Sequence, residues 1–235
     1  MIYNKIKKAG YNMYNIAIDG PAGAGKSTIA KLVAKELDYI YVDTGSMYRA
    51  MALACIRAGI ESSDEENVVN ITKDVDVTIS YENGAQQVYL NGENVNQYIR
   101  TEEVGNMTSA ISVYGPVREK LVELQRKIAS NTNVIMDGRD IGTCVLKDAF
   151  LKIYLTASSK TRAQRRHNEL TEKGIECNID DIERDIIDRD YRDMHREISP
   201  LTQADDAVLV DSSNMSISEV VSTITNLFNE RKKSI

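Results

Sequence analysis

The sequence predicts an α/β protein whose core is a parallel five-stranded sheet flanked by helices. Three observations support this prediction: strand-like and helix-like segments alternate through most of the chain, a glycine-rich loop joins the first strand to the first helix, and a short antiparallel insert interrupts the alternation. Alternating strands and helices form parallel sheets with helices on both faces. At 235 residues, the chain is long enough for one large domain with insertions.

The first strand, over about residues 14–19, leads into a loop that matches G-x-x-x-x-G-K-[ST], and residues 27–37 follow a helical pattern. Glycines allow backbone N–H groups to point inward, and the helix adds the positive end of its dipole. We predict that Lys26 reaches the β- and γ-phosphates of ATP and that Ser27 takes a place on Mg²⁺. An ordinary turn is the alternative, which the complete motif argues against. The predicted ATP-binding loop comprises Gly20, Pro21, Ala22, Gly23, Ala24, Gly25, Lys26, Ser27 and Thr28.

A second strand is predicted over residues 39–42, followed by a helix over residues 47–58 that Gly59 ends. We expect Thr44 or Ser46 to cap this helix. Arg49 is expected in its first turn, close to the carboxyl end of a strand. Ligands bind at that edge in open α/β sheets.

The insert begins after an acidic helical pattern at residues 62–70. Residues 75–81 and 87–90 alternate with period two on either side of Asn83-Gly84, which predicts a β-hairpin. A third short strand is expected near residues 95–99. Two roles stay open for this insert: a decoration of the fold, or a unit that moves to close a site.

Two helices are predicted over residues 101–130, separated at Gly115-Pro116, with Arg118 in the first turn of the second. A buried strand then ends at Asp137, an acid of the kind that supports Mg²⁺ in these folds, directly or through water. Arg139 and Asp140 follow at once.

The last third of the chain is rich in arginine. A strand at residues 151–155 precedes a basic helix, and a helix at about residues 179–197 is expected to present its charged side chains on one face. A strand at residues 208–210 and a helix at residues 216–231 complete the chain. The arginines and the acid of these two basic helices are Arg162, Arg165, Arg166, Arg189, Arg192, Asp193 and Arg196.

Composition excludes several classes of protein. With 42% hydrophobic residues, 27% charged residues and a net charge of −6, the chain does not have the basic character of a general nucleic-acid binder. Three scattered cysteines and two histidines form no zinc signature and predict reduced thiols in the cytoplasm. No apolar run approaches the ~20 residues of a membrane span. We expect residues 1–13 to be a disordered extension, with Met13 as a possible natural start.

A kinase with an anionic acceptor explains these features best. A GTPase would need Asp where Thr72-Lys73-Asp74 is followed by Val75. Transfer to a phosphate brings two polyanions together, and arginine offsets their repulsion because it binds phosphate in a bidentate way. An acceptor phosphate has a second pKa of about 6, so it is ionised and needs no general base.

Four ordered motifs, with the β-insert between the second and third, resemble those of bacterial cytidylate kinases, which are P-loop nucleoside monophosphate kinases. The resemblance runs from about Tyr14 to the final helix. The motifs are residues 20–28, Asp43-Thr44-Gly45-Ser46-Met47-Tyr48-Arg49, Asp137-Gly138-Arg139-Asp140-Ile141-Gly142-Thr143, and Arg189-Asp190-Tyr191-Arg192-Asp193 through Arg196 to Ser199-Pro200-Leu201.

The resemblance implies transfer of phosphate from ATP, with Mg²⁺, to CMP or dCMP by a cytoplasmic protein, which we expect to be a monomer. It implies a core at residues 14–43, 113–158 and 198–235, an acceptor-binding part at about residues 44–112, and a lid at about residues 159–178. Arg49, Arg139 and Arg196 would act with Lys26 in catalysis.

The resemblance also implies a role for each acceptor residue. Thr44, Arg49, Arg139 and Arg196 would surround CMP, with the three arginines directed at its phosphate. Ser109, Arg118 and Asp140 would read cytosine, Arg189 and Asp193 would hold the ribose, and Arg162, Arg165 or Arg166 would cover the ATP phosphates. A carboxylate accepts from the amino group of cytosine, whereas uracil presents an acceptor there.

Other readings stay open. Arg165 and Arg192 are equally explained as solvated surface residues, Tyr41 and Tyr48 are expected to pack, and His195 is expected to be a bystander. A shikimate- or gluconate-type kinase, which phosphorylates a hydroxyl, is the alternative enzyme. A non-catalytic ATP-binding switch is the alternative outside enzymes.

Overall fold

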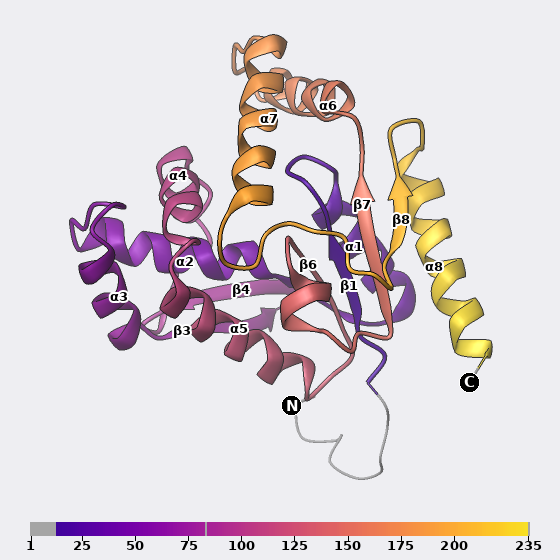
Figure 1. Ribbon diagram of the computed structural model, residues 1–235, viewed down its shortest axis with the longest axis horizontal. Helices are drawn as coiled ribbons and strands as arrows, with labels where there is room; N and C mark the ends of the chain where they lie inside the picture. Colours follow the sequence, from indigo (N-terminus) through magenta and orange to yellow (C-terminus); the bar gives the residue numbers. More distant parts are fainter. Residues whose placement is uncertain (1–12, 83, 235) are drawn as a thin grey trace.

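The computed structural model describes residues 13–82 and 84–234, and within these residues five parallel strands form one sheet (Figure 1). Their order is β2-β6-β1-β7-β8, which confirms the predicted sheet. The predicted extension, except for Met13, lies outside the described residues, as does Asn83 of the hairpin turn. The strands are β1 (Ile16–Asp19), β2 (Ile40–Asp43), β6 (Val134–Gly138), β7 (Leu151–Thr156) and β8 (Val208–Asp211).

The alternation of side chains along β1 builds two cores, one on each face of the sheet. Ile16 and Ile18 join the core that packs beneath α1 (Lys26–Leu37) and α8 (Ile217–Lys233). Ala17 joins the core on the opposite face, where α5 (Gly115–Ala129) lies. Because helices cover both faces of the central strands, the first residues of β1 and of β6 are apolar on both sides.

The register of the strands brings the functional segments to one edge. Ile18 is paired with Asp137, and Asp43 is also paired with Asp137 across β2 and β6. Because all three strands are parallel, the phosphate loop after β1, the helix after β2 and the loop after β6 begin side by side. The site predicted from motifs far apart in sequence is therefore assembled at this edge.

The segment between β2 and β6 contains the insert. Within the described residues, a three-stranded antiparallel sheet follows α3 in the order β3-β4-β5, which confirms the predicted hairpin. Its elements and their neighbours are α2 (Thr44–Arg57), α3 (Glu65–Asp74), β3 (Val77–Glu82), β4 (Ala85–Leu90), β5 (Glu93–Asn94) and α4 (Glu102–Ile111).

Two details of this segment differ from the prediction. The third strand is β5 rather than residues 95–99, because Val95 and Ile99 are both buried one turn apart and Ile99 N–H donates to Val95 O at 3.2 Å. The cap of α2 is Asp43, whose carboxylate accepts from Ser46 N–H at 3.0 Å. The helix therefore begins three residues earlier than predicted, and Arg49 lies in its second turn.

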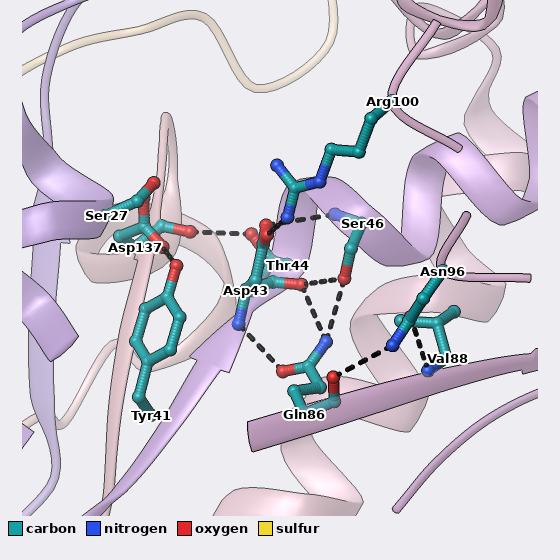
Figure 2. A network of polar contacts seen from close by, with 10 residues as sticks. All are labelled: Ser27, Tyr41, Asp43, Thr44, Ser46, Gln86, Val88, Asn96, Arg100 and Asp137. Atoms are coloured by element: carbon teal, nitrogen blue, oxygen red, sulfur yellow. Dashed lines mark hydrogen bonds and ion pairs between the residues drawn. The ribbon is translucent and has the colours of Figure 1, made fainter. Parts of the chain in front are cut away.

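Gln86 of β4 connects the insert to the central sheet through hydrogen bonds (Figure 2). Its Oε1 accepts from Asp43 N–H at 2.9 Å, and its Nε2 donates to Asp43 O at 3.2 Å and to Ser46 Oγ at 2.8 Å. Tyr81 OH adds a bond to the carbonyl of Tyr41 at 3.1 Å. The insert is thus tied directly to the residues at which α2 begins.

Two helices, α6 (Ser159–Glu172) and α7 (Ile179–His195), pack together beyond the functional edge of the sheet (Figure 1). Arg196 follows α7 with extended dihedral angles, φ −65° and ψ 143°, so the prediction that it shares a helical face with Arg189 is wrong. The chain turns here because Ser199 adopts φ 50° and its carbonyl accepts from Arg196 Nε at 2.6 Å. Within the described residues no helix is long and apolar enough to cross a bilayer.

Gly20 gives a test of how tightly the phosphate loop is fitted to the sheet. Its φ is 149°, and a Cβ atom there would lie 2.0 Å from the carbonyl oxygen of Leu155. We expect Gly20→Ala to lower the free energy of unfolding by about 3 kcal/mol, measured by urea denaturation, because strain and overlap add.

Gly59→Ala is the matched control, since Gly59 also has a positive φ, of 66°, with nothing near the added atom. It should cost only about 1 kcal/mol. Equal losses for the two variants would show that the contact with β7 does not constrain the loop.

Candidate active site

A cavity of about 710 Å³ opens at the carboxyl edge of the sheet, between the core, α4 and the α6–α7 pair. Residues 22–28 of the phosphate loop line it, whereas Gly20 and Pro21 are buried and shape the loop. The other residues predicted for the site all line this one cavity: Thr44, Arg49, Ser109, Arg118, Asp137, Arg139, Asp140, Arg162, Arg166, Arg189, Asp193 and Arg196.

Lys26 occupies the centre of the phosphate loop. It is buried, and its ammonium donates to Pro21 O at 2.7 Å. Burial lowers the pKa of Lys26 well below its usual range, and the charge of Arg139 adds to this shift. Asp137 and Asp19 act in the opposite direction. Phosphate oxygens would supply the further negative charge that a buried ammonium requires.

Asp137, at the end of β6, is held by two hydroxyl donors. Ser27 Oγ donates to its Oδ2 at 2.8 Å and Tyr41 OH to its Oδ1 at 2.7 Å (Figure 2). Burial raises the pKa of Asp137, and the neighbouring Asp43 raises it further. Tyr41 packs against the core as predicted, and its hydroxyl in addition orients the carboxylate of Asp137.

A buried ion pair joins Arg118 of α5 to Asp140, which follows β6. Arg118 also donates to Ser112 O at 3.3 Å, and its guanidinium lies 5.8 Å from the ring centre of Tyr48. Arg196 Nη2 lies 3.5 Å from the second oxygen of Asp140. Tyr48 thus packs as predicted, and its partner is a cation.

Several arginines lie between the phosphate loop and the Arg118–Asp140 pair. They repel one another, and few carboxylates lie among them to offset that repulsion. Burial lowers the pKa of Arg49, Arg189 and Arg196, and neighbouring arginine charges contribute to each shift. Within the described part of the chain, Arg189 Nε and Arg196 Nη2 are buried without a hydrogen-bond partner. Buried unpaired donors are costly, so this arrangement favours an anionic ligand.

Two carboxylates hold arginines in place at the acceptor side. Arg139 Nε donates to Asp193 Oδ2 at 2.7 Å. Burial acts to raise the pKa of Asp193, but Arg139 and Arg189 lower it overall. Arg100 donates to Asp43 Oδ2 at 2.7 Å, with its side chain 60% exposed at the rim of the cavity (Figure 2).

Arg162 stabilises the conformation of the phosphate loop through contacts with Ala22 and Asp190. Its Nη1 donates to Ala22 O at 2.8 Å and lies 2.6 Å from Asp190 Oδ2, while Asp190 Oδ1 accepts from Ala22 N–H at 3.2 Å. Both charged side chains are almost fully buried. Contact of Arg162 with ATP stays a prediction, but its guanidinium already holds the loop in shape.

The remaining arginines of α6 and α7 have different surroundings. Arg165 donates to Ser212 O at 2.7 Å, and Arg166 forms an exposed pair with Glu169 at 2.8 Å. Arg192 is exposed and bonds its own helix at Asp188 O. His195 bonds the backbone of the same helix. Arg192 and His195 are not among the residues that line the cavity, whereas Arg165, for which a surface position was the alternative, does line it.

Sequence reasoning missed several carboxylates. Asp43, Asp190 and Asp19 each hold a backbone segment or an arginine of the site. Asp19 is buried at the end of β1, where burial raises its pKa to about 6. Asp19 and Asp43 both end a strand at the ligand-binding edge, which was a usable signal. Asp190 lies in the fourth of the ordered motifs, but nothing in that motif indicated its contact with Arg162.

Comparisons with known proteins agree with one another. The family model described as "Cytidylate kinase" matches residues 16–230. A cytidylate kinase of Lactobacillus johnsonii is 49% identical over 230 residues, which cover 97% of this chain and 100% of that protein. A cytidylate kinase of Ligilactobacillus salivarius is 50% identical over 216 residues, 92% of this chain and 96% of that protein.

A solved structure of an uncharacterized protein from Eubacterium ventriosum has a similar fold. Its TM-score is 0.52 at 10% sequence identity, and the match covers 93% of this chain and 99% of that chain. At this identity the match supports the fold alone.

Arg162 and Arg166 provide a matched pair for testing which arginines are structural. We expect Arg162→Leu to lower the free energy of unfolding by about 3 kcal/mol, because it leaves Asp190 buried without its cation. Arg166→Leu should change it by less than about 0.5 kcal/mol, since its pair is exposed. Urea denaturation measures both, and a stable Arg162→Leu protein would contradict the supporting role.

Proposed function

The chain belongs to the cytidylate kinase family, and we propose that it transfers the γ-phosphoryl group of ATP to CMP or dCMP. The products are ADP and CDP or dCDP. The observation that carries this proposal is a single cavity that joins a phosphate loop to a buried arginine–carboxylate pair, with arginines lying between the two. A switch that only binds ATP has no need of the second half of this cavity.

The phosphate loop forms the donor half. Inward backbone N–H groups and the start of α1 favour phosphate oxygens, and Lys26 adds a positive charge from within the loop. Arg162 keeps the loop in shape through Ala22. We propose that Lys26 moves from the carbonyl of Pro21 to the phosphates when ATP binds.

The acceptor half is proposed to bind CMP along its whole length. Arg49, Arg139 and Arg196 would hold the phosphate, with Thr44 nearby, and Arg189 and Asp193 would hold the ribose. Ser109, Arg118 and Asp140 would read the base. A carboxylate at Asp140 accepts from the cytosine amino group, whereas uracil would set a carbonyl oxygen against it, which favours CMP over UMP.

The chemical step then needs no proton transfer. An oxygen of the CMP phosphate attacks the γ-phosphorus of ATP, forming a new P–O bond, while the bond from the γ-phosphorus to the bridging oxygen breaks and ADP leaves with that electron pair. The arginines and Lys26 stabilise charge on the transferred group. No general base is required because the attacking oxygen is ionised near neutral pH.

Ser27 and Asp137 fit a magnesium site. Their oxygens lie 2.8 Å apart at the cavity wall, and oxygen ligands suit this ion. We propose that Ser27 and Asp137 hold Mg²⁺, Asp137 directly or through water. The ion would supply neutralisation of the β- and γ-phosphate charge.

We further propose the division of labour that this activity requires. The sheet with its flanking helices, residues 14–43, 113–158 and 198–235, would be the rigid core. Residues 44–112 would bind the acceptor, and residues 159–178 would close over ATP. Among the described residues Cys55, Cys144 and Cys177 are free thiols, which suits a cytoplasmic enzyme. We expect a monomer with nucleotides as its only partners.

An ADP-release assay with five acceptors tests the proposed function. We expect CMP and dCMP to give the highest kcat/KM, UMP less, and AMP and shikimate no rate above the ATP-only background. Lys26→Ala should abolish turnover with every acceptor, whereas Lys35→Ala, an exposed lysine of the same helix, should keep it.

Two other outcomes would contradict the proposed function and identify a different one. Turnover of shikimate without CMP would identify a kinase that acts on hydroxyl acceptors. ATP binding without product from any acceptor would identify a switch.

A further inference from the structure

Asp19 is a buried carboxylate that the proposed chemistry does not use. It ends β1, immediately before Gly20, and only 5% of it is exposed. Its Oδ1 accepts from Ile141 N–H at 2.8 Å and its Oδ2 from Gly142 N–H at 2.7 Å. These two residues directly follow Asp140, so the side chain of Asp19 reaches from the donor loop to the acceptor side.

The peptide unit after Asp140 is held at both ends. Its N–H, on Ile141, donates to Asp19. Its carbonyl, on Asp140, accepts from Cys144 N–H at 2.8 Å and Val145 N–H at 3.2 Å in the short π-helix η1 (Ile141–Val145). A peptide plane fixed on both sides cannot rotate, and the orientation of the Asp140 side chain depends on that plane.

Asp140 in turn sets the positions of two arginines. Its carboxylate pairs with Arg118 and lies 3.5 Å from Arg196 Nη2. A shift of the backbone at Asp140 would therefore move Arg118, which is proposed to read the base together with Asp140, and also Arg196, which is proposed to hold the phosphate. The space around this contact is also tight, because a Cβ atom on Gly142 would lie 3.3 Å from Asp19 Oδ2.

A carboxylate is the side chain that this geometry demands. Two backbone donors converge on it, and a carboxylate offers an acceptor oxygen to each. An asparagine of the same shape offers one acceptor and turns an N–H₂ group toward the second N–H. Burial raises the pKa of Asp19 to about 6, so both oxygens accept at pH 8.

We propose that Asp19 is a positioning residue that sets the preference for cytosine over uracil by fixing the peptide after Asp140. This inference rests on the proposed function, since it concerns selection between CMP and UMP. Asp19 does not touch the acceptor itself, so its effect must pass through Asp140. That requirement separates positioning from a general contribution to stability.

A double-mutant cycle measures this dependence. We determine kcat/KM for CMP and for UMP at pH 8 with saturating ATP, in the wild type, Asp19→Asn, Asp140→Asn and the double variant. Asp19→Asn should lower the CMP:UMP ratio about tenfold, the effect of losing one buried hydrogen bond. In the Asp140→Asn background, where the carboxylate is already gone, Asp19→Asn should leave the ratio unchanged.

Two further variants support the cycle. Asp64→Asn alters another aspartate that accepts from backbone N–H, at the start of α3, and should not change the ratio. Gly142→Ala places a Cβ atom against Asp19 Oδ2, so it should disturb the same hydrogen bond and also lower the CMP:UMP ratio. It is expected to fold, because the closest neighbour of the new atom is Lys152 Cδ at 3.1 Å, and a small shift of that side chain relieves the contact.

The outcomes separate the two proposals. A wild type that prefers CMP, with Asp19→Asn and Gly142→Ala both keeping the ratio, overturns the inference alone. An equal loss of ratio from Asp19→Asn in both backgrounds also overturns it, because the effect would not pass through Asp140. If Asp19→Asn does not fold, Gly142→Ala decides. A wild type without CMP turnover overturns the proposed function and the inference with it.

Discussion

Repulsion among the cations of one cavity is the constraint that the rest of the site must satisfy. Two unit charges 4 Å apart interact by about 4 kcal/mol at the effective dielectric of a protein surface, and Arg118, Arg139, Arg189 and Arg196 all line the same space. Carboxylates placed among them reduce this cost without cancelling it. Burial lowers the pKa of Arg189 and Arg196, and the charges of neighbouring arginines lower it further.

The fold supplies each carboxylate from a rigid element. Asp43 and Asp137 end neighbouring parallel strands in register, Asp193 comes from α7, and Asp140 begins the turn after β6. Because these elements meet at the edge of the sheet, the cations are oriented before any ligand arrives. Arg189 Nε and Arg196 Nη2 are buried without a hydrogen-bond partner, although Arg196 Nη2 lies 3.5 Å from Asp140 Oδ1. We propose that the acceptor supplies these hydrogen bonds, its ribose to Arg189 and its phosphate to Arg196.

The fold and most cavity residues were accessible from the sequence because they depend on local patterns. Short apolar segments that alternate with helical patterns predict the parallel sheet, and the G-x-x-x-x-G-K-[ST] motif predicts the phosphate loop. The supporting contacts were not accessible, since a carboxylate such as Asp190 finds its arginine only when α6 and α7 pack together. The same holds for Tyr41, whose hydroxyl reaches Asp137 through strand register. Arg196 was misplaced because the turn at Ser199 ends the helix early.

The central claim is that Arg49, Arg139 and Arg196 bind the acceptor phosphate. Titration calorimetry of the protein with CMP and with cytidine, at the same ionic strength and without ATP, measures this directly. Two or three charge-assisted hydrogen bonds should make CMP bind about 100-fold more tightly than cytidine. Affinities within about threefold of each other would contradict the claim, because the arginines would then contribute almost nothing to binding.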